Sequence, residues 1–411
     1  MTTEKTTQAV ASTHDTQAPV RPLDGVTVVS LEHAIAAPFC TRQLADMGAR
    51  VIKIERPNVG DFARAYDERV KGMSSHFVWT NRSKESLTLD LKHPDADAIL
   101  QQLLSQADVF VQNLAPGAAK RMGLSFEVLH EKFPKLIVCD ISGYGEGGPY
   151  ETKKAYDLLI QSESGFVSVT GTADEPAKAG CSIADIAAGM YAYSSILNAL
   201  LLRARTGLGS QIDVSMLESM VEWMGFPLYY AYDDAPQPPR AGAAHATIFP
   251  YGPFPVGDGN TVMLGLQNER EWQVFCEMVL LNASLAQNPL FMSNSKRVEN
   301  RDVLRQLIVD ALSDLSIEQV VARLESAQIA NARVNQMKDV WAHPQLHARQ
   351  RWVDVPSPVG KLSTLKPPAT NQSFEARIEA IPALGEHTDM ILTQVGCSDE
   401  QIAKLRQAGA I

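Results

Sequence analysis

The first half of the chain alternates short apolar runs with amphipathic segments. Continuous apolar runs predict strands buried on both faces, and they stand at VTVVSL (26–31), ARVIKIE (49–55), DVFVQN (108–113) and LIVCDIS (136–142). A further short strand is expected to end near Lys92. Apolar residues at helical spacing predict helices from about Pro38 to Met47 and after Pro94. Because strands and helices alternate, this pattern predicts an α/β fold with a mostly parallel sheet.

The pattern changes in the second half. A helix is predicted from about Asp213 to Tyr232, and the Pro-rich stretch DDAPQPPR after it is typical of a linker. Two strands around the Gly-Asp-Gly turn at 257–259 follow. Helices are then expected at about Glu269 to Leu280, Asp302 to Leu312 and Ile317 to Ala327, the last with Ser316 and Gln319 at capping-box spacing. This half predicts a smaller α+β domain.

Composition narrows the classes of function. The hydrophobic share of 45% and the charged share of 20% are those of an ordinary soluble globular protein. A formal net charge of −10 argues against nucleic acid as a partner, because phosphate binding needs a basic surface. No run approaches the 18 or so uninterrupted apolar residues of a membrane span, so no membrane partner is expected.

The cysteines and the N-terminal residues indicate in which cellular compartment the protein is expected. The five cysteines are scattered without a CxxC pair, which predicts neither disulfides nor a zinc site, and no other metal is expected. Residues 1–20 are rich in Thr, Gln and Ala and lack an apolar signal core, so we interpret them as a flexible tail. We therefore expect a cytoplasmic protein.

One carboxylate stands out in the central stretch from Lys154 to Tyr193. Asp185 lies between Ile183-Ala184 and the small-residue series Ile186 to Gly189, at the start of a predicted helix. An acid there commonly caps the helix N-terminus. Alternatively, its small neighbours would let a large ligand approach a reactive carboxylate. Both interpretations stay open from these residues alone.

Two further features concern ligands. The first predicted strand is followed by EHAIAAP without a GxGxxG fingerprint, which disfavours a nicotinamide or flavin enzyme. The second ends at Glu55 and Arg56, and ligands of open α/β sheets collect at the carboxyl ends of strands. Arg56 is therefore a candidate phosphate contact, although a surface ion pair is the commoner role of such an arginine.

An ordered set of motifs resembles the family III CoA-transferases. The motifs begin at about Pro22 and continue to the C-terminus: GVTVVSLEHAIAAPFCTRQLADMGARVIKIERPNVGDFAR, NRSKESLTLDLKHP, VQNLAPGAAKRMG, ISGYGEGGPY, AYDLLIQSESG, CSIADIAAGMYA and LGEHTD. The resemblance implies an acyl-CoA donor, a carboxylic acid acceptor and no tightly bound cofactor, with coenzyme A as substrate and product. The catalytic aspartate of the family falls on Asp185, which would form an aspartyl anhydride and then an aspartyl-CoA thioester.

The resemblance also implies binding residues. Those that would line the substrate site are Tyr156, Asp157, Ile35 and Ala36. Those that would bind CoA are Arg56, Leu89, Lys92, Asn113, Leu114, Arg121 and Lys154. Cations among them suit the phosphates of CoA.

Three functions are compatible with this resemblance. The first is CoA transfer to a carboxylic acid, for which succinate, itaconate, mesaconate, malate and citramalate are the expected candidates. The second is an α-methylacyl-CoA racemase or epimerase, but the racemase histidine falls at Tyr156, and a tyrosine with a pKa near 10 is a poor base. The third is an acyl-CoA-binding homologue without activity.

The sequence departs in two places from the formyl-CoA:oxalate enzymes of the family, and both departures bear on which acid accepts CoA. Formyl-CoA:oxalate enzymes carry a glutamine where Ile35 stands and a glycine run that RAGAAHATIFPYG lacks, which disfavours oxalate. His245 in that stretch could face an acyl pocket or serve structure only.

The architecture implied by the resemblance is an interlocked homodimer. Residues 21–232 would form a large Rossmann-like CoA-binding α/β domain, and 233–335 the small α+β domain. Residues 336–411 would return to the large domain. The active site would lie between the large domain of one chain and the small domain of the other.

Overall fold

Six strands form the main sheet of the computed structural model, which describes residues 20–411. The order in the sheet is β3-β2-β1-β4-β5-β6. The strands are β1 Thr27–Leu31, β2 Arg50–Glu55, β3 Glu85–Thr88, β4 Val109–Gln112, β5 Ile137–Ser142 and β6 Gln211–Ser215. The pairs β1·β2, β1·β4, β2·β3 and β4·β5 are all parallel, with Val28 opposite both Val51 and Val109. The predicted α/β fold with a mostly parallel sheet is confirmed.

The strand order reverses between β1 and β4. The chain adds β2 and β3 on one side of β1 and then returns to place β4 and β5 on the other side. In open α/β sheets the carboxyl ends of the strands at such a reversal border the crevice where ligands bind. The segments after β1 and β4 are therefore the first place to search for a ligand.

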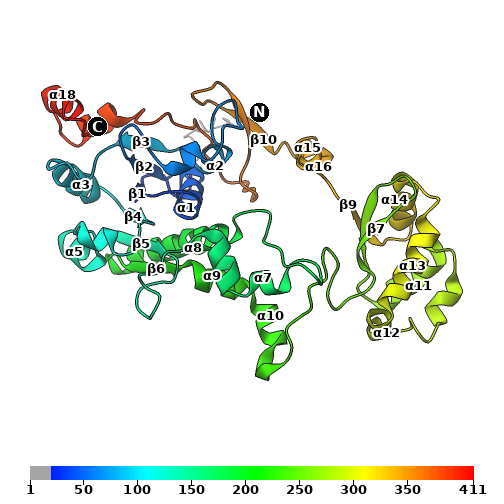
Figure 1. The fold of residues 1–411 in the computed structure, drawn as a ribbon. Helices are drawn as coiled ribbons and strands as arrows, with labels where there is room; N and C mark the ends of the chain where they lie inside the picture. The colour runs from blue at the N-terminus through cyan, green and yellow to red at the C-terminus, as the bar shows by residue number, and fades with distance from the viewer. Residues whose placement is uncertain (1–19) are drawn as a thin grey trace, which may run out of the picture. The chain divides into compact units, whose positions relative to one another are not determined.

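Helices between these strands bury an apolar core. They are α1 Ala36–Asp46, α2 Ser75–Thr80, α3 Ala96–Ser105, α4 Ala118–Arg121 and α5 Phe126–Lys132, with a 3-10 turn η1 at Phe62–Ala65. Leu100 and Leu104 of α3 pack with Ile52 and Phe110 of the sheet, because their helical spacing directs them to one face. Figure 1 labels α3 and the strands of this sheet. The C-terminal helices α17 Thr388–Gln394 and α18 Asp399–Gln407 add Ile391 and Leu405 to the same core.

A long helix, α8 (Ile183–Thr206), carries Asp185 in its first turn. It is preceded by α6 Asp157–Glu163 and α7 Phe166–Val169 and followed, after β6, by α9 Met216–Trp223 and α10 Gly225–Tyr230, with a 3-10 turn η2 at Tyr232–Asp234. Within residues 20–411, α8 alone is long and apolar enough to cross a membrane, by length and composition only. Core helices of soluble proteins can meet the same criterion, and in α8 about 33% of the most apolar stretch is buried, while Leu201 and Leu202 are exposed.

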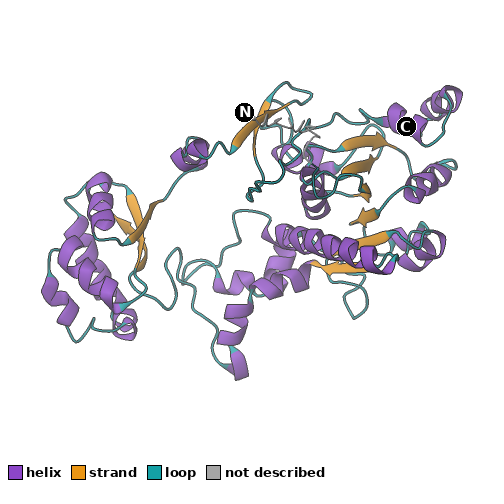
Figure 2. Ribbon diagram, turned by 180° about the vertical axis from the view of Figure 1, so that it is seen from behind, coloured by secondary structure: helices purple, strands orange, loops and turns teal. Residues whose placement is uncertain are grey.

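A second, three-stranded sheet is antiparallel in the order β7-β8-β9, formed by Tyr251–Pro255, Thr261–Gly265 and Ala330–Arg333. One face is covered by helices (Figure 2). They are α11 Glu269–Val274, the π-helix η3 Phe275–Val279, η4 Ala283–Gln287, α12 Asn294–Glu299, α13 Arg301–Leu312 and α14 Ile317–Ser326. Phe254 and Leu264 of the sheet pack with Trp272 and Leu304 of the helices. The predicted capping box of Ser316 and Gln319 is confirmed.

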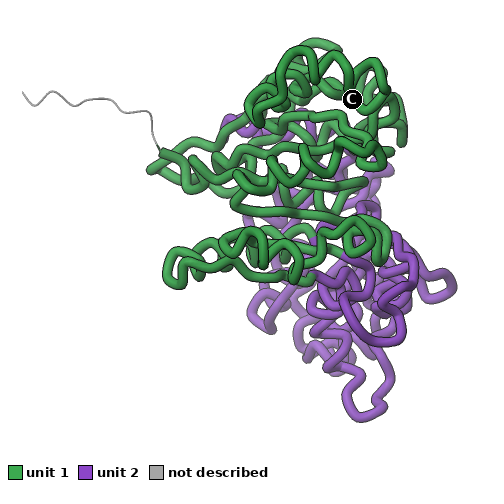
Figure 3. Tube along the Cα trace, turned by 90° about the vertical axis from the view of Figure 1, so that its left-hand side faces the viewer, with its two compact units in different colours: residues 1–141, 189–213, 352–411 green, residues 142–188, 214–351 purple. Residues whose placement is uncertain are grey.

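The chain divides into two compact units (Figure 3). One contains the described part of Met1–Ile141 together with Gly189–Asp213 and Trp352–Ile411, and the other contains Ser142–Ala188 and Val214–Arg351. The last elements are α15 Met337–Trp341, α16 Pro344–Ala348, and the hairpin of β10 Trp352–Val355 and β11 Leu362–Leu365. The boundaries at 232 and 335 stay a prediction, and the tail predicted for 1–20 lies, except for Val20, outside the described residues.

The structure corrects two predicted elements and adds one strand that was not predicted. The third strand ends at Thr88 rather than near Lys92, because Asp90 and the residues after it form a turn. The helix predicted from Asp213 starts at Met216, since residues up to Ser215 pair as β6, and Ser215 then caps α9 by accepting from Glu218 N–H at 3.2 Å. The short polar strand β9 was not predicted.

Candidate active site

Asp185 does not cap its helix. The carboxylate of Asp157, in the first turn of α6, does so: its Oδ1 accepts from Ala184 N–H at 2.8 Å and from Asp185 N–H at 3.4 Å. Oδ2 of Asp157 accepts from the Gln161 amide at 2.6 Å. The capping interpretation of Asp185 is therefore wrong, because the helix N-terminus already has its acceptor.

The Asp185 side chain is half-buried, and its carboxylate makes no hydrogen bond to any residue in 20–411. Burial raises the pKa of Asp185 to about 7, and the negative charge of Asp157 adds to this effect. A half-buried carboxylate without a hydrogen-bond donor lowers the stability of the folded protein. It is also well suited to react, since no hydrogen bond must be broken before it attacks an electrophile.

Replacing Asp185 by Asn is expected to stabilise the fold at alkaline pH. The folded pKa near 7 exceeds the unfolded value of about 3.9, so the cost of ionising Asp185 grows from pH 4 to 7 and is constant above. Because the side chain is partly solvated, we expect a gain of about 1–2 kcal/mol at pH 8 and almost none at pH 4. Urea unfolding of both proteins at the two pH values measures it, and an equal difference at both pH values would contradict the pKa argument.

The small residues after Asp185 have a packing role. Gly189, one helical turn later, lies against α1: a Cβ added to it would come within 2.7 Å of the Ala36 carbonyl oxygen and 3.0 Å of the Phe39 ring. Glycine is required because backbone oxygen cannot give way. The predicted substrate residues Ile35 and Ala36, at the start of α1, are both buried, so contact of their side chains with a ligand would need a change in packing.

The predicted CoA-binding residues outside the central stretch gather at one edge of the main sheet. Arg56 follows β2, Leu89 and Lys92 follow β3, and Asn113 and Leu114 follow β4. Arg121 lies at the end of α4, shortly after β4. Since β2, β3 and β4 run parallel to β1 in the same sheet, their carboxyl ends lie at the same edge. The edge is therefore rich in candidate phosphate ligands.

These residues differ in what they can offer. Arg56, Lys92 and Arg121 have exposed side chains, which suits them to phosphates. The Leu89 side chain is buried in the core, so only its backbone could reach a ligand. The Asn113 amide is engaged with the backbone of His33, donating to its carbonyl at 2.9 Å and accepting from its N–H at 2.8 Å. None of these binding roles is tested by the structure alone, and they stay predictions.

Lys154 and Tyr156 lie just before α6 and are exposed. Lys153 next to them is instead paired with Glu163 and lies 4.3 Å from the centre of the Tyr150 ring. His245 accepts hydrogen bonds at Nδ1 from Thr247 N–H and Ile248 N–H at 3.2 and 3.1 Å and stacks on Tyr251. These contacts give His245 a structural role.

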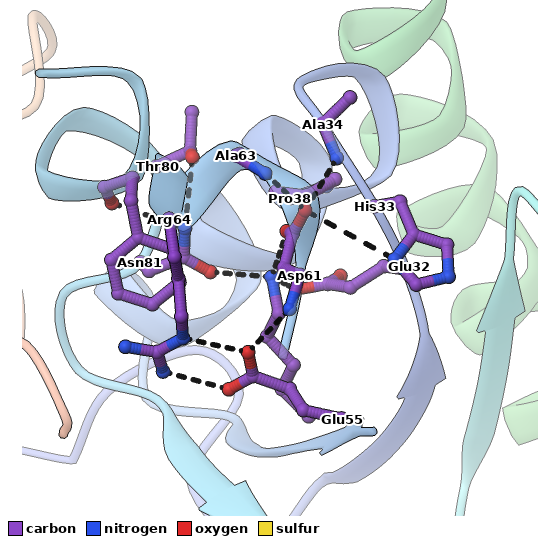
Figure 4. A network of polar contacts seen from close by, with 12 residues as sticks. Glu32, His33, Ala34, Pro38, Glu55, Asp61, Ala63, Arg64, Thr80 and Asn81 are labelled. Atoms are coloured by element: carbon purple, nitrogen blue, oxygen red, sulfur yellow. Dashed lines mark hydrogen bonds and ion pairs between the residues drawn. The ribbon is translucent and has the colours of Figure 1, made fainter. Parts of the chain in front are cut away.

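Sequence reasoning missed a buried ionic network below the ends of β1 and β2 (Figure 4). Lys53 donates to Asp61 Oδ2 at 2.6 Å and lies 3.6 Å from Glu32, while Lys84 donates to Glu32 at 2.7 Å. All four side chains are fully buried. Asn81 joins the two lysines by accepting from both, at 2.9 and 3.2 Å. A lysine inside the apolar run ARVIKIE was the available signal, since buried lysines need partners.

The pKa values of this network follow from burial and pairing. Burial raises the pKa of Glu32 and Asp61, but the lysines outweigh it and hold both pKa values below their ordinary range. Burial lowers the pKa of Lys84 to about 8 despite Glu32. Glu55, which pairs with Arg64 at 2.8 Å, has its pKa lowered to about 2, because that pairing and Lys53 exceed the effect of burial. The carboxylates are therefore ionised at neutral pH.

Comparison with known proteins identifies the family. The sequence profile of CoA-transferase family III matches residues 23–388. The chain belongs to this family. Family III relatives of the chain include the human succinyl-CoA:glutarate CoA-transferase, which is 32% identical over 95% of this chain and 90% of its own length. Other relatives are named for succinyl-CoA with mesaconate or D-citramalate, and one from Acetobacter aceti for acetyl-CoA with oxalate.

The fold agrees with a solved structure. A CAIB/BAIF family protein from Brucella suis superimposes with a TM-score of 0.82 and 32% identity, covering 91% of this chain and 99% of that one. The resemblance stated from the motifs is thereby confirmed. The chain is an acyl-CoA:carboxylate CoA-transferase of family III, with CoA thioesters as substrates.

Proposed function

We propose that this enzyme transfers CoA from succinyl-CoA or a similar acyl-CoA to a small dicarboxylic acid, with Asp185 as the nucleophile. The observation that carries the proposal is a half-buried carboxylate without a hydrogen bond in the described chain, at a helix N-terminus that Asp157 already caps. Relatives that act on glutarate, mesaconate and D-citramalate support a dicarboxylate. Succinate, itaconate, mesaconate, malate, citramalate and glutarate are the acids to test.

The reaction proceeds through two anhydrides. The Asp185 carboxylate attacks the thioester carbonyl, the C–S bond breaks, and CoA thiolate leaves an aspartyl-acyl anhydride. The thiolate attacks the aspartyl carbon, which releases the donor acid as a carboxylate and forms an aspartyl-CoA thioester. The acceptor carboxylate displaces the thiolate again, and the thiolate then attacks the acceptor carbonyl. This last step yields the new acyl-CoA and restores Asp185.

The exposed cations at the carboxyl edge of the main sheet would hold the nucleotide. Arg56, Lys92 and Arg121 suit the phosphates of CoA as donors and as positive charges in a chain whose net charge is −10. Local positive charge is needed because the chain as a whole repels an anionic ligand.

A matrix of donors and acceptors tests the proposal. Succinyl-CoA and acetyl-CoA are incubated with each acid, with oxalate included because of the Acetobacter aceti relative, and the CoA esters are measured by mass spectrometry. We expect transfer from succinyl-CoA to at least one C4 or C5 dicarboxylate and little to oxalate. Hydrolysis without transfer to any acid would refute the proposal.

The racemase alternative has a separate test. The residue at the racemase base position, Tyr156, is 72% exposed, and Asp157 beside it has both oxygens engaged in hydrogen bonds. Neither is poised to remove an α-proton. Incubating a 2-methylacyl-CoA in D₂O should give no exchange at Cα, whereas exchange without CoA transfer would establish the alternative.

We further propose that the enzyme is a cytoplasmic homodimer. Apolar side chains on and beside α9 and α10 are exposed in the single chain: Trp223, Phe226, Leu228, Tyr229, Tyr230 and Tyr232. Large apolar side chains that are exposed together in one short segment are typical of protein interfaces. A second copy of the chain is the expected partner, because the family resemblance implies interlocked chains.

Light scattering after size exclusion should report twice the chain mass of 44.9 kDa. The double variant Phe226→Asp/Tyr229→Asp should give monomers or aggregates, because charges in an apolar interface cost several kcal/mol. As a control, Val303→Asp on the exposed face of α13 should stay dimeric. A wild-type mass of one chain would contradict the dimer.

A further inference from the structure

His33 stands where the strand order reverses. It follows Glu32 directly after β1, beside Asn113 at the end of β4, and these are the two strands between which the order reverses. Its side chain is 20% exposed, so part of the ring is accessible to a ligand without being free in solvent. None of the family motifs and none of the comparisons assigns a role to it.

The backbone on both sides of His33 is fixed by side chains. The Asn113 amide bonds both its N–H and its carbonyl, at 2.8 and 2.9 Å. The next residue, Ala34, has a φ of +61° and donates its N–H to Asp61 Oδ1 at 3.0 Å. A left-handed alanine costs about 1 kcal/mol, and the buried Lys53 that holds Asp61 adds desolvation cost. Strain held in place by a buried ion pair is typical of functional positions.

The ring of His33 has one buried and one open edge. It stacks on Phe62, with ring centres 4.7 Å apart, and Phe62 itself is 43% exposed. Nδ1 is buried without a hydrogen-bond partner in residues 20–411, and Asp61 Oδ1 lies 4.0 Å from it. Nε2 makes no hydrogen bond to the described chain and belongs to the open edge. Figure 4 shows the ring at the margin of the network, turned away from Glu55 and Arg64.

The charge state of His33 limits what it can bind. Burial lowers the pKa of His33, and Lys53 and Arg56 lower it further, while Asp61 opposes them. The ring is therefore neutral at pH 7, and the carboxylate near Nδ1 favours the proton there. Nε2 is then a hydrogen-bond acceptor, which repels phosphate oxygens and attracts N–H or O–H groups.

We propose that His33 Nε2 accepts a hydrogen bond from an amide N–H of the pantetheine arm of the bound CoA ester, with the Phe62 ring lining the arm. This inference rests on the proposed use of acyl-CoA. The arm is the neutral part of CoA that offers N–H donors along a chain narrow enough for a half-buried edge. The phosphates go to the exposed cations such as Arg56, which immediately follows β2.

Binding of CoA and of 3′,5′-ADP, which lacks the arm, tests this by calorimetry at pH 7.5. His33→Phe keeps a ring on Phe62 and removes the acceptor, so CoA affinity should fall about tenfold while 3′,5′-ADP affinity stays the same. His33→Gln, whose amide can reach the place of Nε2, should recover part of the loss. His130→Phe is the matched control, because His130 also stacks on a phenylalanine, Phe126, at 4.9 Å, and should bind both ligands normally.

The outcomes separate the two proposals. If wild type fails to bind CoA, the proposed function fails first. Unchanged CoA affinity in His33→Phe, or an equal loss for 3′,5′-ADP, overturns the role of His33 alone. Thermal unfolding of each variant excludes a folding defect as the cause, and His33→Gln carries the comparison if His33→Phe does not fold.

Discussion

Asp185→Asn is expected to lose CoA transfer by about 10³-fold or more while it still binds acyl-CoA, because asparagine keeps the shape of the side chain but cannot form the anhydride. Asp314→Asn, which changes an exposed aspartate between α13 and α14, should keep full activity. Steady-state transfer rates measured with the same donor and acceptor compare the variants. Activity of Asp185→Asn within tenfold of wild type would remove the nucleophile from the mechanism.

The covalent intermediate should be visible directly. Incubation with succinyl-CoA and then hydroxylamine should convert the aspartyl-CoA thioester to a hydroxamate on the peptide containing Asp185. Peptide mass spectrometry should find this mass change in wild type and not in Asp185→Asn. Modification of another acidic residue would show that the chemistry lies elsewhere.

The pH dependence of the transfer rate follows from the ionisation of Asp185. Attack requires the ionised carboxylate, and burial raises the pKa of Asp185 to about 7. We expect kcat/KM to rise with pH through an inflection near 7 and to level off above it, because that parameter reports the free enzyme. An ordinary aspartate would already be ionised at pH 5 and would give a flat profile.

Elements with local signals could be predicted from the sequence. Continuous apolar runs predicted β1, β2, β4 and β5, because strands buried on both faces need no alternation. The strands β6 (QIDVS) and β9 (ANAR) have mixed or exposed residues, so their pairing depends on neighbours distant in the sequence. The start of α9 did have a local signal in Ser215, whose side chain accepts from Glu218 N–H.

Individual residues of the site could be predicted from the sequence, but the contacts between them could not. Asp185 was found from its small neighbours and the family motif, but its helix is capped by Asp157, 28 residues earlier in the chain. No local sequence pattern predicts such a contact. Likewise, the motif residue Asn113 was expected to bind CoA, yet its amide is engaged with the backbone of His33, 80 residues away. Long-range contacts therefore decide which polar residues remain free for a ligand.

The second large effect is expected from Lys53→Met, which should lower the free energy of unfolding by about 3–5 kcal/mol. The lysine is fully buried and donates to Asp61 and Asn81. Methionine fills a similar volume, so packing changes little. Stability falls because the two buried carboxylates, Asp61 and Glu32, are left to share a single positive charge. Lys296→Met is the matched control: Lys296 is half exposed, and its pair with Glu299 should contribute less than about 1 kcal/mol.

The pH dependence of this loss distinguishes a lost ion pair from poor packing. In wild type the lowered pKa values of Asp61 and Glu32 contribute stability above their unfolded pKa of about 4, and this contribution disappears as the pH falls through the folded values. In Lys53→Met the unpaired carboxylates can relieve their cost by taking up protons. The difference between the proteins in urea unfolding should therefore be largest at pH 7 and shrink toward pH 4. A difference that does not change with pH would show that poor packing, rather than a lost ion pair, lowers the stability of Lys53→Met.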